Sequence, residues 1–458
     1  MLIPPIDLRV FLHVLEQADQ LARVQVMVDP CLELATIVDH FGKAGGTNRA
    51  LLFEKVRGTS LPVTVNLFGS EQRMAWALGT TDLEAVAAKL AEGLAATGLN
   101  DPEQALINLC AAPQYYPTVC SQAACREIDH TKQGLHFLPQ VQAWPGDGGR
   151  YLTLAQVITR GYDDALQNCG MYRVQLIDDQ HAAVRCRAGS GMMQHLAQWH
   201  AAGKSMPVAV VLGGPPVLTW AATAPLPQEV DELDFCGYLT GQRLAVTACD
   251  SHELLVPADA EVVIEGTIDP GAQGCEGPFG NHTGYYDPVG TAPTMRVSRI
   301  TSRTDAICPW TLVGPPPREN IHMARASARL LMPLMRMAMP TLRALFMPQE
   351  GIFHRAALVT VDVKEARPLE ELAQILRGTP LLKDARLLVV GADDHDPRDA
   401  AAVFWRVLNR VDRQQDLLVE NGRLTVDARR IPQGEPVRCD STVLHGVLAR
   451  WSEYRING

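Results

Sequence analysis

The sequence predicts a mixed α/β protein built in three parts. The first part combines a helical apolar pattern with a short strand. The middle part consists of short β-rich segments between Gly/Pro loops, a pattern typical of a β-barrel or split barrel. The last part alternates strand and helix, which favours a parallel sheet with flanking helices. The 458 residues are also the length of about three domains.

The N-terminal part is expected to span residues 1–115. Asp7 should begin a helix, because the apolar residues after it recur on one helical face: Leu8, Phe11, Leu12 and Leu15. Residues 61–67 have strand character. Thr81 and Glu84 have the spacing of a capping box ahead of an Ala/Leu-rich helix. Residues 111–117 then form a plausible linker.

The middle part, residues 116–315, shows strand patterns and little sign of helix. The expected strands are residues 172–177, 208–212, 262–265 and 295–300.

The C-terminal part, residues 316–458, opens after a Gly-Pro-Pro-Pro run with a helical stretch that Pro333 and Pro340 interrupt. Two strands should then alternate with two helices, in the order 359–363, 369–376, 387–390 and 400–411.

The amino-acid composition limits the classes of partner that the chain can bind. The chain has 41 Lys and Arg against 51 Asp and Glu, a net charge of −10, which argues against broad binding to nucleic acid or anionic membranes. Eleven cysteines without a CxxC pair indicate reduced thiols. The charged N-terminus does not read as a signal peptide, and the longest uncharged stretch, residues 205–228, is interrupted by Gly and Pro. We therefore expect a cytoplasmic protein without integral membrane association.

One loop carries unusual chemistry. Residues 275–286 combine an acid, an amide, an imidazole and two phenols with three glycines, which let a backbone approach a ligand closely. The same residues are also consistent with a tight turn whose polar groups are incidental. The chain contains no Walker A, GxGxxG, GxSxG or HExxH motif.

Other polar residues are ambiguous by themselves. Asn168 and Arg173 would point to opposite faces of one strand unless Gly170 kinks it. Arg173 could bind a carboxylate or lie on the surface, and His195 and Glu232 could be ligands or structural residues. The acidic cluster at residues 393–396 could bind a ligand or be solvated.

Taken together, these segments resemble the UbiD family of decarboxylases over nearly the whole chain. The strongest match is a near-complete EGPFGxHTGYY motif at residues 276–286, supported by residues 168–173 and 221–227. The resemblance implies an N-terminal α/β domain, a central split β-barrel domain that binds flavin, and a C-terminal α/β domain with an oligomerisation helix.

The resemblance also implies cofactors: prenylated FMN, a divalent metal (Mn²⁺ or Mg²⁺) and K⁺. The family's metal ligands correspond to Asn168, His195 and Glu232, and oxygen and imidazole ligands suit Mn²⁺ or Mg²⁺ more than zinc. The loop that includes Ala222 would offer carbonyls to K⁺. The implied cofactor-binding residues are Asn168, Met171, Arg173, Gln194, His195, Ala222, Thr223 and Glu232.

The implied catalytic residues are Arg173, Glu276 and a second acid at position 281. Here that position is Asn281, and an amide cannot transfer a proton as a carboxyl does. Either Glu276 acts alone, or another group such as His282 or a water assists. A lysine contact to the cofactor cannot be carried over, because the C-terminal motifs are poorly matched.

The implied reaction is reversible, non-oxidative decarboxylation of an aromatic, heteroaromatic or α,β-unsaturated acid, with Glu276 as proton donor and Arg173 orienting the carboxylate. Candidate substrate contacts are His282, His322 and Met332. Three alternatives remain: the 4-hydroxy-3-polyprenylbenzoate decarboxylase of ubiquinone synthesis, a non-catalytic cofactor-binding subunit, and an ordinary FMN oxidoreductase. Expected partners are a flavin prenyltransferase that supplies the cofactor and further copies of the chain, as a dimer or hexamer.

Overall fold

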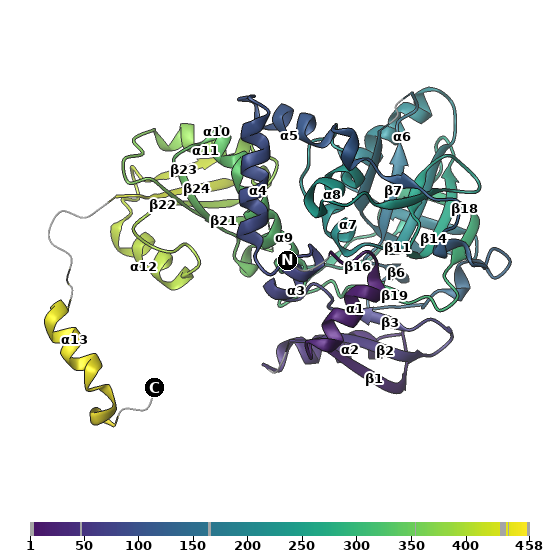
Figure 1. The fold of residues 1–458 in the computed structure, drawn as a ribbon, viewed down its shortest axis with the longest axis horizontal. Helices are drawn as coiled ribbons and strands as arrows, with labels where there is room; N and C mark the ends of the chain where they lie inside the picture. The colour runs from purple at the N-terminus through teal and green to yellow at the C-terminus, as the bar shows by residue number, and fades with distance from the viewer. Residues whose placement is uncertain are drawn as a thin grey trace.

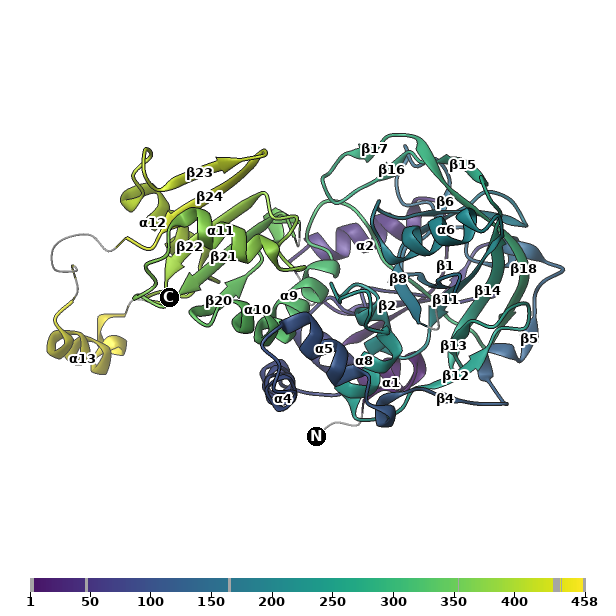
Figure 2. The ribbon, with the colours of Figure 1, turned by 90° about the horizontal axis from the view of Figure 1, so that it is seen from above.

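The computed structural model describes residues 4–45, 48–163, 166–352, 354–430, 437 and 439–455. The N-terminal elements and the central sheet lie together, and a separate C-terminal sheet lies beyond α9 (Asn320–Leu330) (Figures 1 and 2). Within the described residues, no helix has the length and apolar character needed to cross a membrane.

The first helix forms as the sequence predicts. In α1 (Leu8–Gln17), the Asp7 carboxylate accepts a hydrogen bond from Val10 N at 2.8 Å, and the predicted apolar stripe is buried. The remaining N-terminal elements are β1 (Leu21–Val28), α2 (Glu33–Lys43), β2 (Ala50–Val56), β3 (Val63–Val65), α3 (Glu71–Ala77), α4 (Leu83–Ala96) and α5 (Pro102–Cys110).

The predicted capping box of α4 is wrong. The N-cap is Asp82, whose carboxylate accepts from Glu84 N at 2.9 Å, and the helix begins at Leu83. A carboxylate caps well and also interacts favourably with the positive end of the helix dipole, so Asp82 takes the place of Thr81.

The N-terminal sheet is completed by a strand from far along the chain. Its order is β1-β2-β3-β19, and β19 (Cys308–Trp310) pairs parallel to β3. The N-terminal and central parts are thus joined by backbone hydrogen bonds that the sequence pattern did not predict.

The central part is a curled, largely antiparallel sheet, as predicted. Its main path runs β6-β9-β10-β18-β14-β11-β7-β8, and β5 and β15 pair with β18. The strands of this sheet are β5 (Ile128–Asp129), β6 (Arg150–Leu152), β7 (Gln156–Arg160), β8 (Gln167–Met171), β9 (Arg173–Leu176), β10 (His181–Arg185), β11 (Met206–Gly213), β14 (Ala260–Ile268), β15 (Gln273–Glu276) and β18 (Gly290–Ser302). Smaller sheets add β4 (Thr118–Val119), β12 (Ala245–Ala248) and β13 (Leu255–Pro257), and the hairpin β16 (Phe279–Gly280) with β17 (Tyr286–Asp287).

β11 shows how this sheet is buried on both faces. All eight of its residues are buried. Val208 and Val210 belong to one hydrophobic cluster, whereas Ala209 and Val211 belong to another. Because strand side chains alternate between faces, a continuous apolar run is what two-sided burial requires.

The expectation of little helix in the central part is wrong. Among the described residues of this part, three α-helices lie between the strands: α6 (Gly191–Ala201), α7 (Pro216–Ala221) and α8 (Glu232–Thr240). Every residue of α7 is buried, and most of α8 is too. A helix that is buried all round has no polar face, so it lacks the periodicity by which helices are predicted.

The C-terminal sheet has the order β20-β21-β22-β24-β23. Its inner strands β21 (Ala356–Val361), β22 (Leu387–Ala392) and β24 (Arg423–Ala428) run parallel, with antiparallel edges β20 (Leu342–Phe346) and β23 (Leu417–Glu420). The predicted alternation is confirmed by α11 (Leu369–Gly378) and α12 (Ala400–Arg410). The remaining helices are α10 (Met332–Ala338) and α13 (Ser441–Ala449).

Candidate active site

A cavity of about 760 Å³ lies where the central sheet meets the C-terminal part. Its walls come from β8 and β9, the start of α6, the end of α7, the β16–β17 hairpin and α9. The C-terminal part closes one side with His354 and with residues 380, 381, 383 and 384. Of the predicted site residues, the cavity is lined by Met171, Arg173, Ala222, Thr223, Asn281 and His282.

Asn168 and Arg173 are close in sequence but lie on two different strands of the curled sheet. β8 is the last strand of the main path and β9 lies near its other end, so residues 168 and 173 belong to different strands. The expectation that their side chains point to opposite faces of one strand therefore does not apply. Gly170 is required for another reason: a Cβ there would lie 2.5 Å from the ring of Tyr172.

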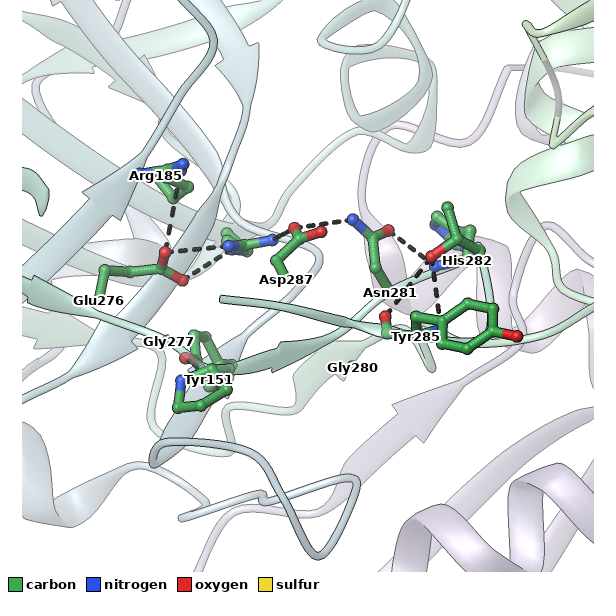
Figure 3. Close-up of polar contacts among 12 residues, drawn as sticks. Tyr151, Arg185, Glu276, Gly277, Gly280, Asn281, His282, Tyr285 and Asp287 are labelled. Carbon is green, nitrogen blue, oxygen red and sulfur yellow. Dashed lines mark hydrogen bonds and ion pairs between the residues drawn. The ribbon is translucent and has the colours of Figure 1, made fainter. Parts of the chain in front are cut away.

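Arg173 holds two carboxylates at the cavity wall. Its Nε and Nη2 donate to Glu276 at 2.8 and 2.9 Å, and its Nη1 donates to Asp287 Oδ2 at 2.7 Å (Figure 3). The guanidinium also stacks 4.2 Å from the ring centre of Phe279. Burial lowers the pKa of Arg173, but the hydrogen bonds to both carboxylates outweigh it, so its pKa is raised and it stays charged.

The side chains of Glu276 and Asp287 differ in how far they are exposed to the cavity. The Glu276 side chain is 0% exposed and does not line the cavity, whereas the Asp287 side chain is 37% exposed and does. Arg185 Nε lies 3.8 Å from Glu276. Burial raises the pKa of Asp287, yet the hydrogen bonds from Arg173 and Asn281 prevail, so its pKa lies below the usual value.

Asn281 is held in one orientation by its neighbours. Its Nδ2 donates to Asp287 Oδ2 at 2.8 Å, and its Oδ1 accepts from His282 N at 2.7 Å (Figure 3). His282 Nδ1 lies 3.3 Å from Gly314 O. Burial lowers the pKa of His282 to about 4, so its imidazole is neutral at neutral pH.

Close backbone packing holds the loop around Glu276. Asp147 accepts from Gly280 N at 2.7 Å and from Trp144 N at 2.9 Å. A Cβ at Gly280 would lie 2.2 Å from the ring of Trp144. The glycines of the motif therefore allow the loop to pack directly on residues 144–148.

Gly148 is expected to be intolerant of any side chain. A Cβ there would lie 2.0 Å from the backbone oxygen of Gly277, next to Glu276. We expect Gly148→Ala to lower the free energy of unfolding by about 1–3 kcal/mol in urea titrations. Gly378→Ala is the control, because nothing lies within 4 Å of a Cβ at that position. Equal unfolding midpoints for the two variants would contradict this prediction.

The three predicted metal ligands converge around β8. Asn168 pairs with Thr159 of β7, and the Thr159 hydroxyl lies 3.0 Å from His195 Nδ1. Glu232 accepts from Cys169 N, the next residue along β8, at 2.8 Å.

Two features of this site fit a metal and a phosphate. Glu232 is buried, and burial together with the charge of Asp231 raises its pKa to about 8, so a cation beside it would favour its ionised form. A Cβ at Gly191 would lie 2.1 Å from Asn168 Oδ1, so only glycine lets the first turn of α6 approach this side chain. The Ser190 side chain forms no capping bond with α6 and lines the cavity, next to backbone N–H groups that suit a phosphate.

The structure places the other predicted residues in different settings. Ala222 O accepts from Met171 N at 2.8 Å, and Thr223 Oγ1 donates to Trp220 O at 2.7 Å. Gln194 donates to Gly189 O at 3.2 Å. His322 lines a separate cavity of about 80 Å³, and Met332 packs on the C-terminal hydrophobic cluster, so neither is part of the main cavity wall.

Three family models match consecutive stretches of the chain. They describe the N-terminal domain (residues 12–92), the Rift-related domain (118–316) and the C-terminal domain (321–434) of 3-octaprenyl-4-hydroxybenzoate carboxy-lyase. Together they span most of the sequence. The chain belongs to the UbiD family of decarboxylases.

Relatives and solved structures agree with this assignment. An uncharacterized protein of Archaeoglobus fulgidus is 34% identical over 90% of this chain and 86% of its own length. The UbiD-class enzyme HmfF of Pelotomaculum thermopropionicum, in complex with prFMN, has a TM-score of 0.81 at 26% identity, covering 95% of this chain and 97% of that one. Vanillic acid decarboxylase of Sedimentibacter hydroxybenzoicus, in its closed form, has a TM-score of 0.83 at 26% identity, covering 99% of both chains.

Sequence reasoning missed two groups of residues in this UbiD site. The first is Asp287, which directly follows the EGPFGxHTGYY motif. A carboxylate at that position is the sequence feature that could have identified it as a site residue. The second group comes from the C-terminal part, where Lys383, Asp384 and His354 line the cavity without any motif that connects them to it.

Proposed function

We propose that this chain is a prenylated-FMN-dependent decarboxylase of a small aromatic or heteroaromatic carboxylic acid. The observation that carries the proposal is the ion pair between Arg173, which lines a cavity of about 760 Å³, and the fully buried Glu276 behind it. The likeness to HmfF in complex with prFMN and to vanillic acid decarboxylase supports it.

The residues around β8 would hold the cofactor. Asn168, His195 and Glu232 would bind Mn²⁺ or Mg²⁺, and backbone carbonyls near Ala222 would bind K⁺. The first turn of α6 would bind the phosphate. When bound, prenylated FMN supplies an electron sink that accepts the electron pair left by loss of CO₂.

The protein's own residues would bind the substrate and move the proton. Arg173 uses three of its five N–H groups on Glu276 and Asp287, so two remain to orient the substrate carboxylate. Glu276 would deliver the proton to the carbon that loses CO₂. The reverse carboxylation would use the same groups at high CO₂.

The cavity supports a small acid over a polyprenylated one. Its volume of about 760 Å³ must hold the flavin nucleotide as well as the substrate. Its C-terminal side is lined by apolar residues, Met347 and Leu381 among them, and also by the charged residues Lys383 and Asp384.

A substrate comparison tests this choice. We expect turnover of at least one single-ring or two-ring aromatic acid, measured as CO₂ release, and none of 4-hydroxy-3-polyprenylbenzoate. Turnover of the polyprenylated acid alone would replace our proposal with a role in ubiquinone synthesis.

The proposed cofactor is tested before any substrate is known. Protein co-expressed with a flavin prenyltransferase and supplied with manganese should show prenylated-flavin absorbance. Folded protein that stays colourless would overturn the proposal and favour a non-catalytic role. Flavin that exchanges electrons with NAD(P)H would favour an oxidoreductase.

We also propose that the chain assembles as a homo-oligomer through its C-terminal third. The apolar side chains Phe404, Trp405 and Leu408 of α12 are more than half exposed, as is Leu448 of α13. The native mass of the same preparation distinguishes a dimer or hexamer from a monomer.

A further inference from the structure

The hairpin after Glu276 brings two positions together beside Arg173. Phe279 of β16 pairs with Asp287 of β17, and Asn281 N donates to Tyr285 O at 3.0 Å across the turn. As a result, the side chains of Asn281 and Asp287 share a hydrogen bond of 2.8 Å. A carboxylate at position 281 would therefore lie one hydrogen bond away from the place that the Asp287 carboxylate occupies.

The cluster contains a carboxylate that faces the cavity, although position 281 is an amide. Asp287 Oδ2 accepts from both Arg173 and Asn281, and its side chain lines the cavity. Glu276 has no exposed surface, and both of its oxygens accept from Arg173. Of the two carboxylates, Asp287 is the one that water in the cavity reaches, so it is placed to return a proton to the cluster after Glu276 has given one up.

We propose that Asp287 supplies the second carboxylate of the proton relay, in place of an acid at position 281; this inference rests on the proposed decarboxylation. Arg173 links Asp287 to Glu276, with Nη1 on one carboxylate and Nε and Nη2 on the other. Asn281 acts as a positioning residue, because its amide donates to Asp287 and its carbonyl is held by His282 N.

The proposed decarboxylation conserves atoms, electrons and protons. The C–C bond to the carboxylate breaks and CO₂ leaves, while the electron pair of that bond forms a C–H bond with one proton. That proton comes from the carboxyl cluster, which regains it from water through Asp287. The negative substrate entering beside two carboxylates favours proton uptake by the cluster, since like charges raise proton affinity. No oxidant or reductant is consumed.

The test exchanges the acid and the amide between the two positions. Asp287→Asn should lower kcat by about 10²–10³-fold, with KM within about threefold of wild type. The double variant Asn281→Asp/Asp287→Asn puts the carboxylate at position 281 and the amide at position 287. This variant should recover most of the lost rate. Flavin absorbance per protein should be unchanged in both variants, because these two side chains hydrogen-bond to Arg173, to His282 and to one another, and none of these bonds is to a proposed metal ligand.

The control is Asp305→Asn, which removes an exposed carboxylate that also binds an arginine, Arg9, at 2.7 Å outside the cavity. It should keep wild-type kcat. An Asp287→Asn variant with near-normal kcat would overturn the inference, as would an exchanged double variant no faster than Asp287→Asn at full flavin content. Wild-type protein that decarboxylates no aromatic acid would instead refute the proposed function itself.

Discussion

Glu276→Gln is expected to lower kcat by at least about 10³-fold while the protein still binds flavin. The Glu276 carboxylate is fully buried and accepts two hydrogen bonds from Arg173, at 2.8 and 2.9 Å. Glutamine has the same size but can neither take up nor release a proton, and its NH₂ group faces a guanidinium that can only donate. Steady-state rates and flavin absorbance of the variant would be compared with those of wild type.

A second buried pair provides a close control for this variant. Glu261 is also 0% exposed and binds Arg9 through both oxygens, at 3.0 and 3.1 Å, but it does not line the main cavity. Glu261→Gln should therefore destabilise the fold by a similar mechanism and keep the kcat of the folded fraction. A Glu276→Gln variant as active as Glu261→Gln would contradict the assignment of Glu276 as proton donor.

Loss of a metal ligand should remove both the metal and the flavin. His195 lies against Thr159, which pairs with Asn168, and Glu232 binds the backbone next to Asn168. We expect His195→Ala and Glu232→Gln to weaken Mn²⁺ binding by more than the roughly 10–100-fold that loss of an outer partner causes. Flavin would then be lost with it, because its phosphate would be left without the cation.

The matched control is His200→Ala, which changes a histidine in the last turn of the same helix. Metal content per protein and flavin absorbance would be measured after dialysis against a chelator. His200→Ala should behave as wild type in both. Full metal and flavin content in His195→Ala would contradict the proposed site.

Several elements follow from local sequence alone. Asp7 and the stripe after it specify α1, because the cap and the apolar face lie within ten residues of one another. The apolar run in β11 and the alternation around β21 and β22 were also predicted correctly. In contrast, α7 and α8 were missed, since helices buried on all sides lack a polar face.

The site was predictable only in part. The motif at residues 276–286 and its resemblance to one family pointed to Glu276 and, with residues 168–173, to Arg173. Neither the pattern nor the resemblance pointed to Asp287, because its relevance depends on the hairpin that places it against Asn281. Lys383 and His354 line the cavity only because the C-terminal part packs beside α9.

The sequence by itself therefore determined the fold class and the family, and it pointed to Glu276 and Arg173 as the proposed acid and arginine. Tertiary structure decided which groups touch. Arg173 and Glu276 are 103 residues apart in the chain, and Arg173 and Asp287 are 114 apart. The physical reason is that periodicity and capping act within a few turns, whereas the distances between these side chains depend on sheet register, curl and the close packing of Gly148 and Gly280.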